Sequence, residues 1–234
     1  MILKFIGFVD LTIEPILWFI VSAIFFMQGI YFMNKFLKSE KEAQPFFGGV
    51  MIFMYGWGFS RLLETIRRYY VGYYYDIIDM NYNITGSSLI LRLLYVTVSY
   101  AAIACFFYVT ENKIFDKKTH SIFTISTIFQ IVLSDLIYFN IPTLIPVIIL
   151  FFIIGIFPIC IFFGFAISKF GEKRIPWVLL GIGMTLFVLG VAGDNPEAYE
   201  IVKGLGTALI HYGTPLFVIS GSIIITIAFL DLYR

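Results

Sequence analysis

Long apolar runs without charged residues are the feature that most constrains this chain. One of them extends over residues 144–167 without a single charged side chain. A helix that crosses a bilayer needs about 20 mostly apolar residues, because lipid offers the backbone no hydrogen-bond partners. Only 13% of the residues are charged and 60% are hydrophobic, whereas about a quarter are charged in water-soluble domains. The sequence therefore predicts an integral membrane protein.

The runs predict an all-α bundle of seven membrane-crossing helices, forming a single transmembrane domain over residues 1–234. The helices are expected at residues 11–33, 46–65, 88–110, 121–139, 144–167, 176–192 and 206–230. A membrane β-barrel does not fit, because its strands alternate apolar and polar residues, whereas these runs are apolar on every face.

Basic residues predict the orientation, since Lys and Arg concentrate in the cytoplasmic loops of membrane proteins. One set of connections, with the chain end, contains ten: Lys35, Lys38, Lys41, Lys113, Lys117, Lys118, Lys169, Lys173, Arg174 and Arg234. The opposite set contains four: Lys4, Arg67, Arg68 and Lys203. We therefore expect the N-terminus outside and the C-terminus inside, in the cell membrane.

The connection at residues 66–87 is expected to lie along the outer membrane interface. It is rich in tyrosine, whose ring and hydroxyl suit the headgroup region. It also contains the sequon Asn83, Ile84 and Thr85, which makes Asn83 a candidate glycosylation site on an external segment.

Ionisable residues within the expected crossing helices gather at one depth. Six of them fall within about two helical turns of the predicted outer ends: Glu14, Arg61, Glu64, Arg92, Asp135 and His211. An ionisable residue at the centre of a span costs about 2.5–3.5 kcal/mol to insert, so each needs a partner, water or a function. The inner two-thirds of the bundle has almost no titratable group.

Helical spacing places these groups on defined faces, because residues three, four and seven apart share a face. On the second helix one face carries Trp57, Arg61, Glu64 and Arg68, beside the small residues Gly49, Gly56 and Ser60. The third helix carries Ser88, Arg92, Tyr95 and Ser99, and the seventh carries Thr207, His211, Thr214 and Ser222. The small residues would admit another helix closely. We predict that the polar faces form a shallow basin open to the outside, with His211 as its pH-responsive group.

Two further patterns concern the helices themselves. The spacing of Gly49 and Gly56 recurs at Gly183 and Gly190, which is compatible with a duplicated three-helix unit around one linking helix. Prolines predict bends in the fifth helix (Pro146 and Pro158) and in the seventh (Pro215).

Several chemistries find no support in the residue types present. A net charge of +1 gives no basic excess for nucleic acid. Cys105 and Cys160 lie inside apolar runs, and His120 and His211 are expected at opposite membrane surfaces, so no disulfide or metal site is favoured. The last helix has no lysine for a retinal Schiff base, and no serine stands in a hydrolase motif. We expect no cofactor and no enzymatic activity.

These observations predict a receptor-like or sensory protein whose basin binds a small polar or anionic ligand. Residues expected to contact the ligand or line the site are Arg61, Arg92, His211, Tyr95 and Trp57. Residues expected to orient them by charge-assisted hydrogen bonds are Glu14, Glu64 and Asp135. A bent helix would pass occupancy to the inner loops, where a separate cytoplasmic partner would read it. Two alternatives stay open: a transporter or permeation pathway, and a scaffold in which these charges neutralise one another and join the helices.

Overall fold

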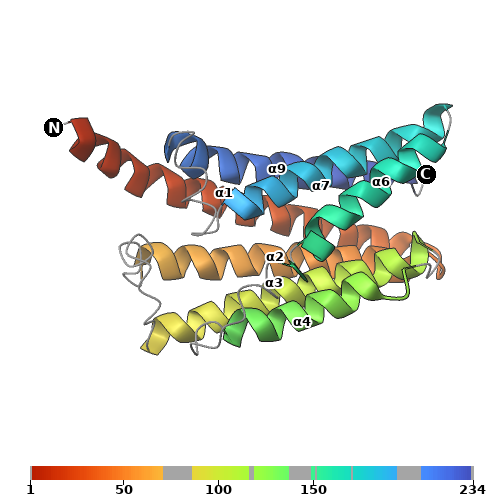
Figure 1. The fold of residues 1–234 in the computed structure, drawn as a ribbon, viewed down its shortest axis with the longest axis horizontal. Helices are drawn as coiled ribbons and strands as arrows, with labels where there is room; N and C mark the ends of the chain where they lie inside the picture. The colour runs from red at the N-terminus through yellow and green to blue at the C-terminus, as the bar shows by residue number, and fades with distance from the viewer. Residues whose placement is uncertain are drawn as a thin grey trace. The chain divides into compact units, whose positions relative to one another are not determined.

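The computed structural model describes residues 2–70, 86–115, 119–136, 149–150, 152–169, 171–193 and 207–232 (Figure 1). Its α-helices are α1 (Ile2–Lys38), α2 (Gln44–Tyr70), α3 (Gly86–Lys113), α4 (Ile122–Leu136), α6 (Phe157–Ser168), α7 (Ile175–Gly193) and α9 (Thr207–Leu232). A π-helix, η2 (Phe152–Ile156), precedes α6, and a 3₁₀-helix, η3 (Gly171–Arg174), precedes α7. No described residue lies in a strand, so the all-α prediction is confirmed for this part of the chain.

Five helices contain a stretch long and apolar enough to cross a bilayer. These stretches are Ile13–Lys38, Gln44–Tyr69, Ser87–Lys113, Ile175–Gly193 and Tyr212–Leu232. Even the shortest, of 19 residues, is about 28 Å long, close to the roughly 30 Å of hydrocarbon in a bilayer. Two further described apolar helices are shorter, Ile122–Ser134 and Ile153–Ser168. The chain thus has the architecture of a helical integral membrane protein.

Helix α2 extends further than the sequence predicted. It continues to Tyr70, whereas the prediction assigned residues 66–87 to an external connection. Residues 66–70 thus continue α2 and residues 86–87 begin α3, so both helices are longer than the crossing segments that were predicted. Arginine is a good helix former, so a change from apolar to basic residues does not end a helix. The rest of the segment, residues 71–85 with Asn83, lies outside the described residues.

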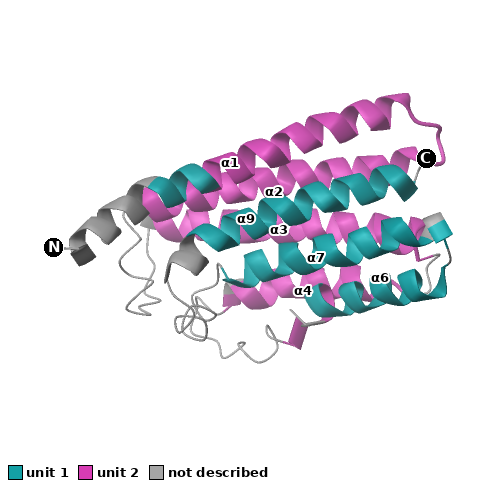
Figure 2. Ribbon diagram, turned by 90° about the horizontal axis from the view of Figure 1, so that it is seen from above, with its two compact units in different colours: residues 1–17, 155–234 teal, residues 18–154 magenta. Residues whose placement is uncertain are grey.

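The chain forms two compact units, which Figure 2 colours separately. Unit 2 comprises residues Trp18–Ile154 and contains α2, α3, α4 and the greater part of α1. Unit 1 comprises Met1–Leu17 and Gly155–Arg234, with α6, α7 and α9. Helix α1 therefore passes from one unit to the other at Trp18.

Glycines let α2 and α3 of unit 2 approach closely. A Cβ atom added at Gly56 would lie 2.6 Å from Ala102 Cβ, and one added at Gly49 would collide with the side chain of Val109. Lipid tails are as apolar as the helices, so close contact at small residues is a main source of helix association in membranes. The predicted contact face of α2 is confirmed.

The same contact continues toward the end of α2 through a buried serine. Ser60 Oγ lies 3.0 Å from the backbone oxygen of Tyr95, to which it donates a hydrogen bond, and it also pairs with Ser99 Oγ. A hydroxyl inside a membrane bundle is costly without a partner. These bonds therefore fix the register of α2 against α3 next to the predicted polar faces.

The α3–α4 connection is joined by a buried carboxylate that the sequence did not reveal. Glu111, near the end of α3, is 1% exposed. It accepts hydrogen bonds from Thr119 Oγ1 at 2.9 Å, Phe123 N at 3.0 Å and Thr124 N at 3.1 Å, and also from Thr124 Oγ1. The first backbone N–H groups of a helix have no partner within it and attract negative charge. Glu111 therefore caps α4 from the preceding helix.

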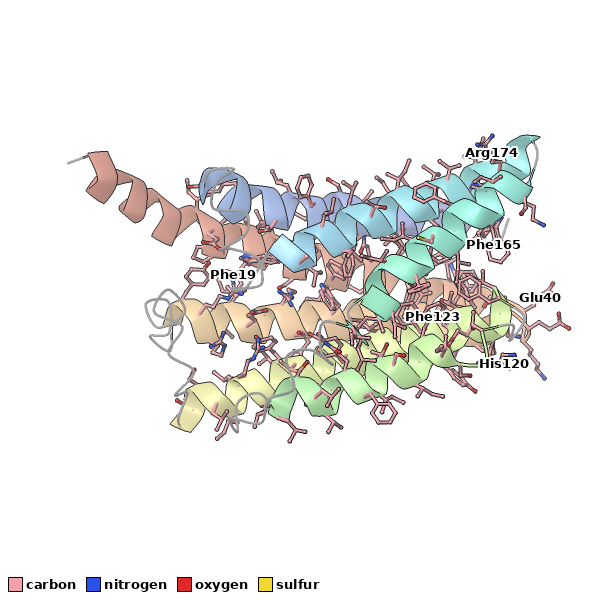
Figure 3. The ribbon with its side chains drawn as sticks, in the orientation of Figure 1. Phe19, Glu40, His120, Phe123, Phe165 and Arg174 are labelled. Carbon is pink, nitrogen blue, oxygen red and sulfur yellow. The ribbon has the colours of Figure 1, made fainter. Side chains whose placement is uncertain are left out.

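The turn that Glu111 encloses has an unusual backbone. His120 and Ser121 have φ angles of 49° and 60°, in the left-handed region. Figure 3 labels His120 and Phe123 at this turn. Such conformations cost about 1–3 kcal/mol and persist only where neighbouring interactions impose them. Here the Glu111 bonds hold Thr119 and Phe123 on either side of the turn.

Glycines also mark the α7–α9 contact of unit 1. A Cβ added at Gly221 would lie 2.6 Å from Phe187 N and 2.7 Å from Gly183 O, and one added at Gly190 would lie 2.8 Å from Thr214 O. The atoms approached belong to the backbone, so the two helix backbones meet without an intervening side chain. Both glycine pairs noted in the sequence thus lie where one helix closely approaches another.

Pro158 coincides with an irregularity at the start of α6. It lies in the first turn of α6, directly after the π-helix Phe152–Ile156. Proline lacks an N–H and disrupts the regular helical ladder, and π segments are a known cause of bends. Pro215 lies inside α9, as predicted, whereas Pro146 lies outside the described residues.

Candidate functional site

A glutamate joins two arginines on α2. Glu64 Oε2 lies 2.8 Å from Arg61 Nη1, and Glu64 Oε1 lies 2.9 Å from Arg68 Nη2. The three residues stand one turn apart, which is the spacing at which helical side chains meet. Arg61 and Glu64 are both buried. One carboxylate therefore serves two guanidinium groups inside unit 2.

Tryptophan rings surround the first of these arginines. The Arg61 guanidinium carbon lies 4.8 Å from the ring centre of Trp57 and 5.4 Å from that of Trp18. Tryptophan is the best aromatic partner for a cation, and the interaction strengthens when water is excluded. The ion pair with Glu64 and the two indole rings together hold Arg61 in place.

A tyrosine of α3 lies against two other arginines, one from each helix. The Tyr95 ring centre is 4.7 Å from the guanidinium carbon of Arg92 and 5.5 Å from that of Arg67. Tyr95 and Arg67 are each only 3% exposed. Arg92 of α3 also acts electrostatically on the Glu64 carboxylate. The charged faces of α2 and α3 therefore belong to one arginine cluster, comprising Arg61, Glu64, Arg67, Arg68, Arg92 and Tyr95.

Buried hydroxyl groups beside this cluster lack hydrogen-bond partners among the described residues. They are Tyr95 Oη and Ser88 Oγ, and Ser88 lies one turn before Arg92 on α3. The Trp18 indole N–H is also buried and also lacks a hydrogen-bond partner among the described residues. Buried polar atoms in folded proteins nearly always have a partner, so such atoms call for an explanation. For these donors the described residues of the chain therefore supply no acceptor.

At the opposite end of unit 2 the basic residues are exposed and not buried. Lys35, Lys38 and Lys41 lie around the α1–α2 turn, Lys113 ends α3, and all four side chains are exposed. In the described part of the arginine cluster, four arginines face a single glutamate. The lysines are exposed, including Lys35, which lies over the ring of Tyr31, whereas Arg61 and Arg67 are buried against aromatic rings.

Five of the eight predicted ligand residues lie in or beside this cluster: Trp57, Arg61, Glu64, Arg92 and Tyr95. Glu14 is buried in the part of α1 that belongs to unit 1. The side chains of Asp135 and His211 lie outside the described residues, although their positions fall within α4 and α9. The structure therefore brings together the predicted residues of α2 and α3.

Arg67 is the cluster residue that sequence reasoning missed. It was assigned to an external connection, yet it lies within α2 and is buried. Its spacing contains a usable signal, because Ser60, Glu64 and Arg67 follow each other at intervals of four and three along one helix face. That face is the one that contacts α3.

The described residues contain no group of three or more His, Cys, Asp or Glu side chains that could hold a metal ion. Comparison of the chain with models of known protein families, with characterised proteins and with solved structures finds no match.

Proposed function

We propose that this chain is a receptor-like or sensory membrane protein that binds a small anion at the arginine cluster. The observation that carries the proposal is the excess of positive charge on buried and half-buried side chains, four arginines against Glu64 among the described residues of the cluster. Adding the other acidic residues predicted within the crossing helices, Glu14 and Asp135, still leaves the arginines in excess. Ionisable groups at such depth in a membrane tend to serve a function.

The arginines have different roles in this proposal. Arg61 is held by Glu64 and two indole rings, so it serves to position the cluster. Arg67 and Arg92 lie over the ring of Tyr95, and in this proposal they contact the ligand. Guanidinium groups suit this task because they remain charged when buried and form paired hydrogen bonds to oxyanions.

The proposal includes a topology of seven crossings with the N-terminus outside, in the cell membrane, and a cytoplasmic partner that reads occupancy. The exposed lysines at the α1–α2 turn support this orientation. We expect a cysteine introduced by Lys41→Cys, in a background with Cys105→Ser and Cys160→Ser, to react with a membrane-impermeant maleimide only after cells are permeabilised. A tag at the N-terminus should be detected on intact cells. Labelling of the new cysteine on intact cells would contradict this orientation and would place the α1–α2 turn outside the cell.

Anion binding is tested with purified protein in phosphatidylcholine nanodiscs. Chloride, acetate, sulfate and inorganic phosphate are titrated while thermal unfolding is followed by tryptophan fluorescence. At least one anion should raise the unfolding temperature in a saturable way, because a ligand that binds the folded state stabilises it by mass action. Arg67→Gln with Arg92→Gln should remove this stabilisation. The matched control is Lys38→Gln with Lys113→Gln, which removes equal charge from exposed positions and should leave it intact.

Three outcomes would overturn the sensory proposal. If no anion stabilises the protein, the cluster is not an anion site. If Arg61→Gln and Arg92→Gln each leave the protein unfolded in detergent, and no anion raises the unfolding temperature of the unaltered protein, the arginines hold the bundle together and the scaffold alternative replaces the proposal. If the protein carries the bound anion into sealed vesicles, the protein is a transporter.

A further inference from the structure

We propose that Glu111 and residues 119–124 form a latch, a turn with a closed and an open state that carries the response of the arginine cluster to the cytoplasmic side. In the closed state the Glu111 carboxylate accepts hydrogen bonds from the start of α4. In the open state these bonds are broken and the backbone of the turn relaxes. The latch itself depends only on contacts within unit 2, whereas the signal that it carries rests on the proposed function.

The backbone of the latch supplies the tendency to open. His120 and Ser121 follow each other with φ angles of 49° and 60°. Residues with a side chain adopt this left-handed region rarely, and then as single residues. Such a conformation persists only where neighbouring contacts impose it. Loss of those contacts should therefore let both residues return to ordinary φ angles.

The Glu111 carboxylate keeps the latch closed. It accepts a hydrogen bond from Thr119 Oγ1 at 2.9 Å, before the strained pair, and from the backbone N–H groups of Phe123 at 3.0 Å and Thr124 at 3.1 Å, after it. One side chain thus bridges both sides of the strained pair. Because Glu111 belongs to α3, closure depends on where α3 places this carboxylate.

Aromatic contacts keep the opening local. The Phe123 side chain is buried, and its ring centre lies 5.4 Å from that of Phe107 and 6.2 Å from that of Phe115. These ring contacts do not depend on the carboxylate. When the hydrogen bonds to Glu111 break, the Phe123 ring still holds the start of α4 against α3. Opening therefore changes the turn without separating the two helices.

Helix α3 connects the latch to the arginine cluster. It carries Arg92 and Tyr95 toward one end and Glu111 toward the other, with Arg92 and Glu111 roughly 28 Å apart along the helix axis. No proline interrupts α3 between them, so a common cause of bending is missing and the helix can move as one rod. An anion that binds the cluster more tightly in one position of α3 therefore shifts the latch. The exposed Lys113 places the latch at the proposed cytoplasmic end.

Hydrogen exchange at the backbone amides of Phe123 and Thr124 tests the latch, with the protein in phosphatidylcholine nanodiscs. His120→Gly with Ser121→Gly should slow exchange about tenfold, because glycine adopts a positive φ freely and the relief of strain exceeds the cost of its greater freedom in the open state. The matched control is Ile122→Gly. Ile122 is the next residue and lies in α4, so glycine there should make exchange faster.

The signal is tested by adding chloride, acetate, sulfate or inorganic phosphate to the same nanodiscs. An anion that raises the unfolding temperature should also change exchange at Phe123 and Thr124 by about fivefold or more, the lower end of coupling between two sites. The amides of Ala43 and Gln44, which bond to Glu40 O in the α1–α2 turn, should keep their exchange rates. This control separates coupling through α3 from a general gain in stability. Arg67→Gln with Arg92→Gln should abolish the change at the latch.

The outcomes separate the latch from the proposed function. If the glycine pair leaves exchange unchanged or makes it faster, the turn is not strained toward opening and the latch is wrong, whatever the anions do. If the pair slows exchange but a stabilising anion leaves the latch amides unchanged, the signalling role is wrong and the anion site stands. If no anion stabilises the protein, the proposed function fails and the signal fails with it, while the glycine pair still decides whether the turn has two states.

Discussion

Glu111→Ala is expected to lower the free energy of unfolding by about 4 kcal/mol. The substitution removes a buried carboxylate that accepts hydrogen bonds from Thr119, Phe123 and Thr124. Each hydrogen bond to a charged group contributes about 1.5–3 kcal/mol, and losses within one network are less than additive. The measurement is an unfolding titration in mixed detergent micelles. Hydrogen exchange at the backbone amides of Phe123 and Thr124 should become faster at the same time.

The control for this prediction is Glu40→Ala. Glu40 is exposed at the α1–α2 turn of the same unit (Figure 3), so its loss should change stability by no more than about 0.5 kcal/mol. The capping role of Glu111 is contradicted if the two variants are equally stable. It is also contradicted if amide exchange at the start of α4 is unchanged in Glu111→Ala.

Gly221→Leu is expected to destabilise unit 1 by about 3 kcal/mol. Even a single Cβ atom at this position would lie 2.6 Å from Phe187 N and 2.7 Å from Gly183 O. Both are backbone atoms and cannot turn aside, so α9 must move away from α7 along the whole contact. Forcing extra carbon atoms into a packed interface typically costs about 1–3 kcal/mol, and the backbone contact places this case at the upper end. The same unfolding titration provides the measurement.

Gly164→Leu is a matched control within unit 1. A Cβ atom added at Gly164 of α6 has nothing within 4 Å, so the larger side chain meets open space. This variant should be as stable as the unaltered protein or more so, since glycine is a weak helix former. Equal destabilisation by both substitutions would show that the close approach of α7 and α9 does not determine the effect.

The fold could be predicted from the sequence to the extent that hydropathy alone determines it. Long apolar stretches specify helices in a membrane because only a helix satisfies its backbone hydrogen bonds within a single segment. The contact face of α2 was also predictable, since Gly56 and Ser60 remove the side-chain bulk that separates helices. The C-terminal end of α2 was not predictable, because arginine and tyrosine are compatible with both a helix and a connecting segment and so do not mark a helix end.

The candidate site was predicted in part. Residues of α2 and α3 were found because charges in an apolar helix stand out and helical spacing assigns them to a face. Arg67 was missed because a basic residue near a span end resembles an ordinary loop residue, although its spacing from Ser60 and Glu64 assigns it to the helix face that contacts α3. Glu111 was missed for a different reason: its backbone partners lie 12 and 13 residues away on the next helix, so no local pattern contains them.

The division of basic residues between the two ends of unit 2 has a consequence for how the protein responds to electrolyte. Salt at physiological concentration screens charges in water over about 8 Å but has little effect on charges kept from water. The attraction of the exposed lysines for acidic phospholipids should therefore weaken as ionic strength rises. The pairing of Arg61 with Glu64 should remain almost unchanged at high salt, so that ionic strength acts on the lysine end of unit 2 and leaves this buried ion pair intact.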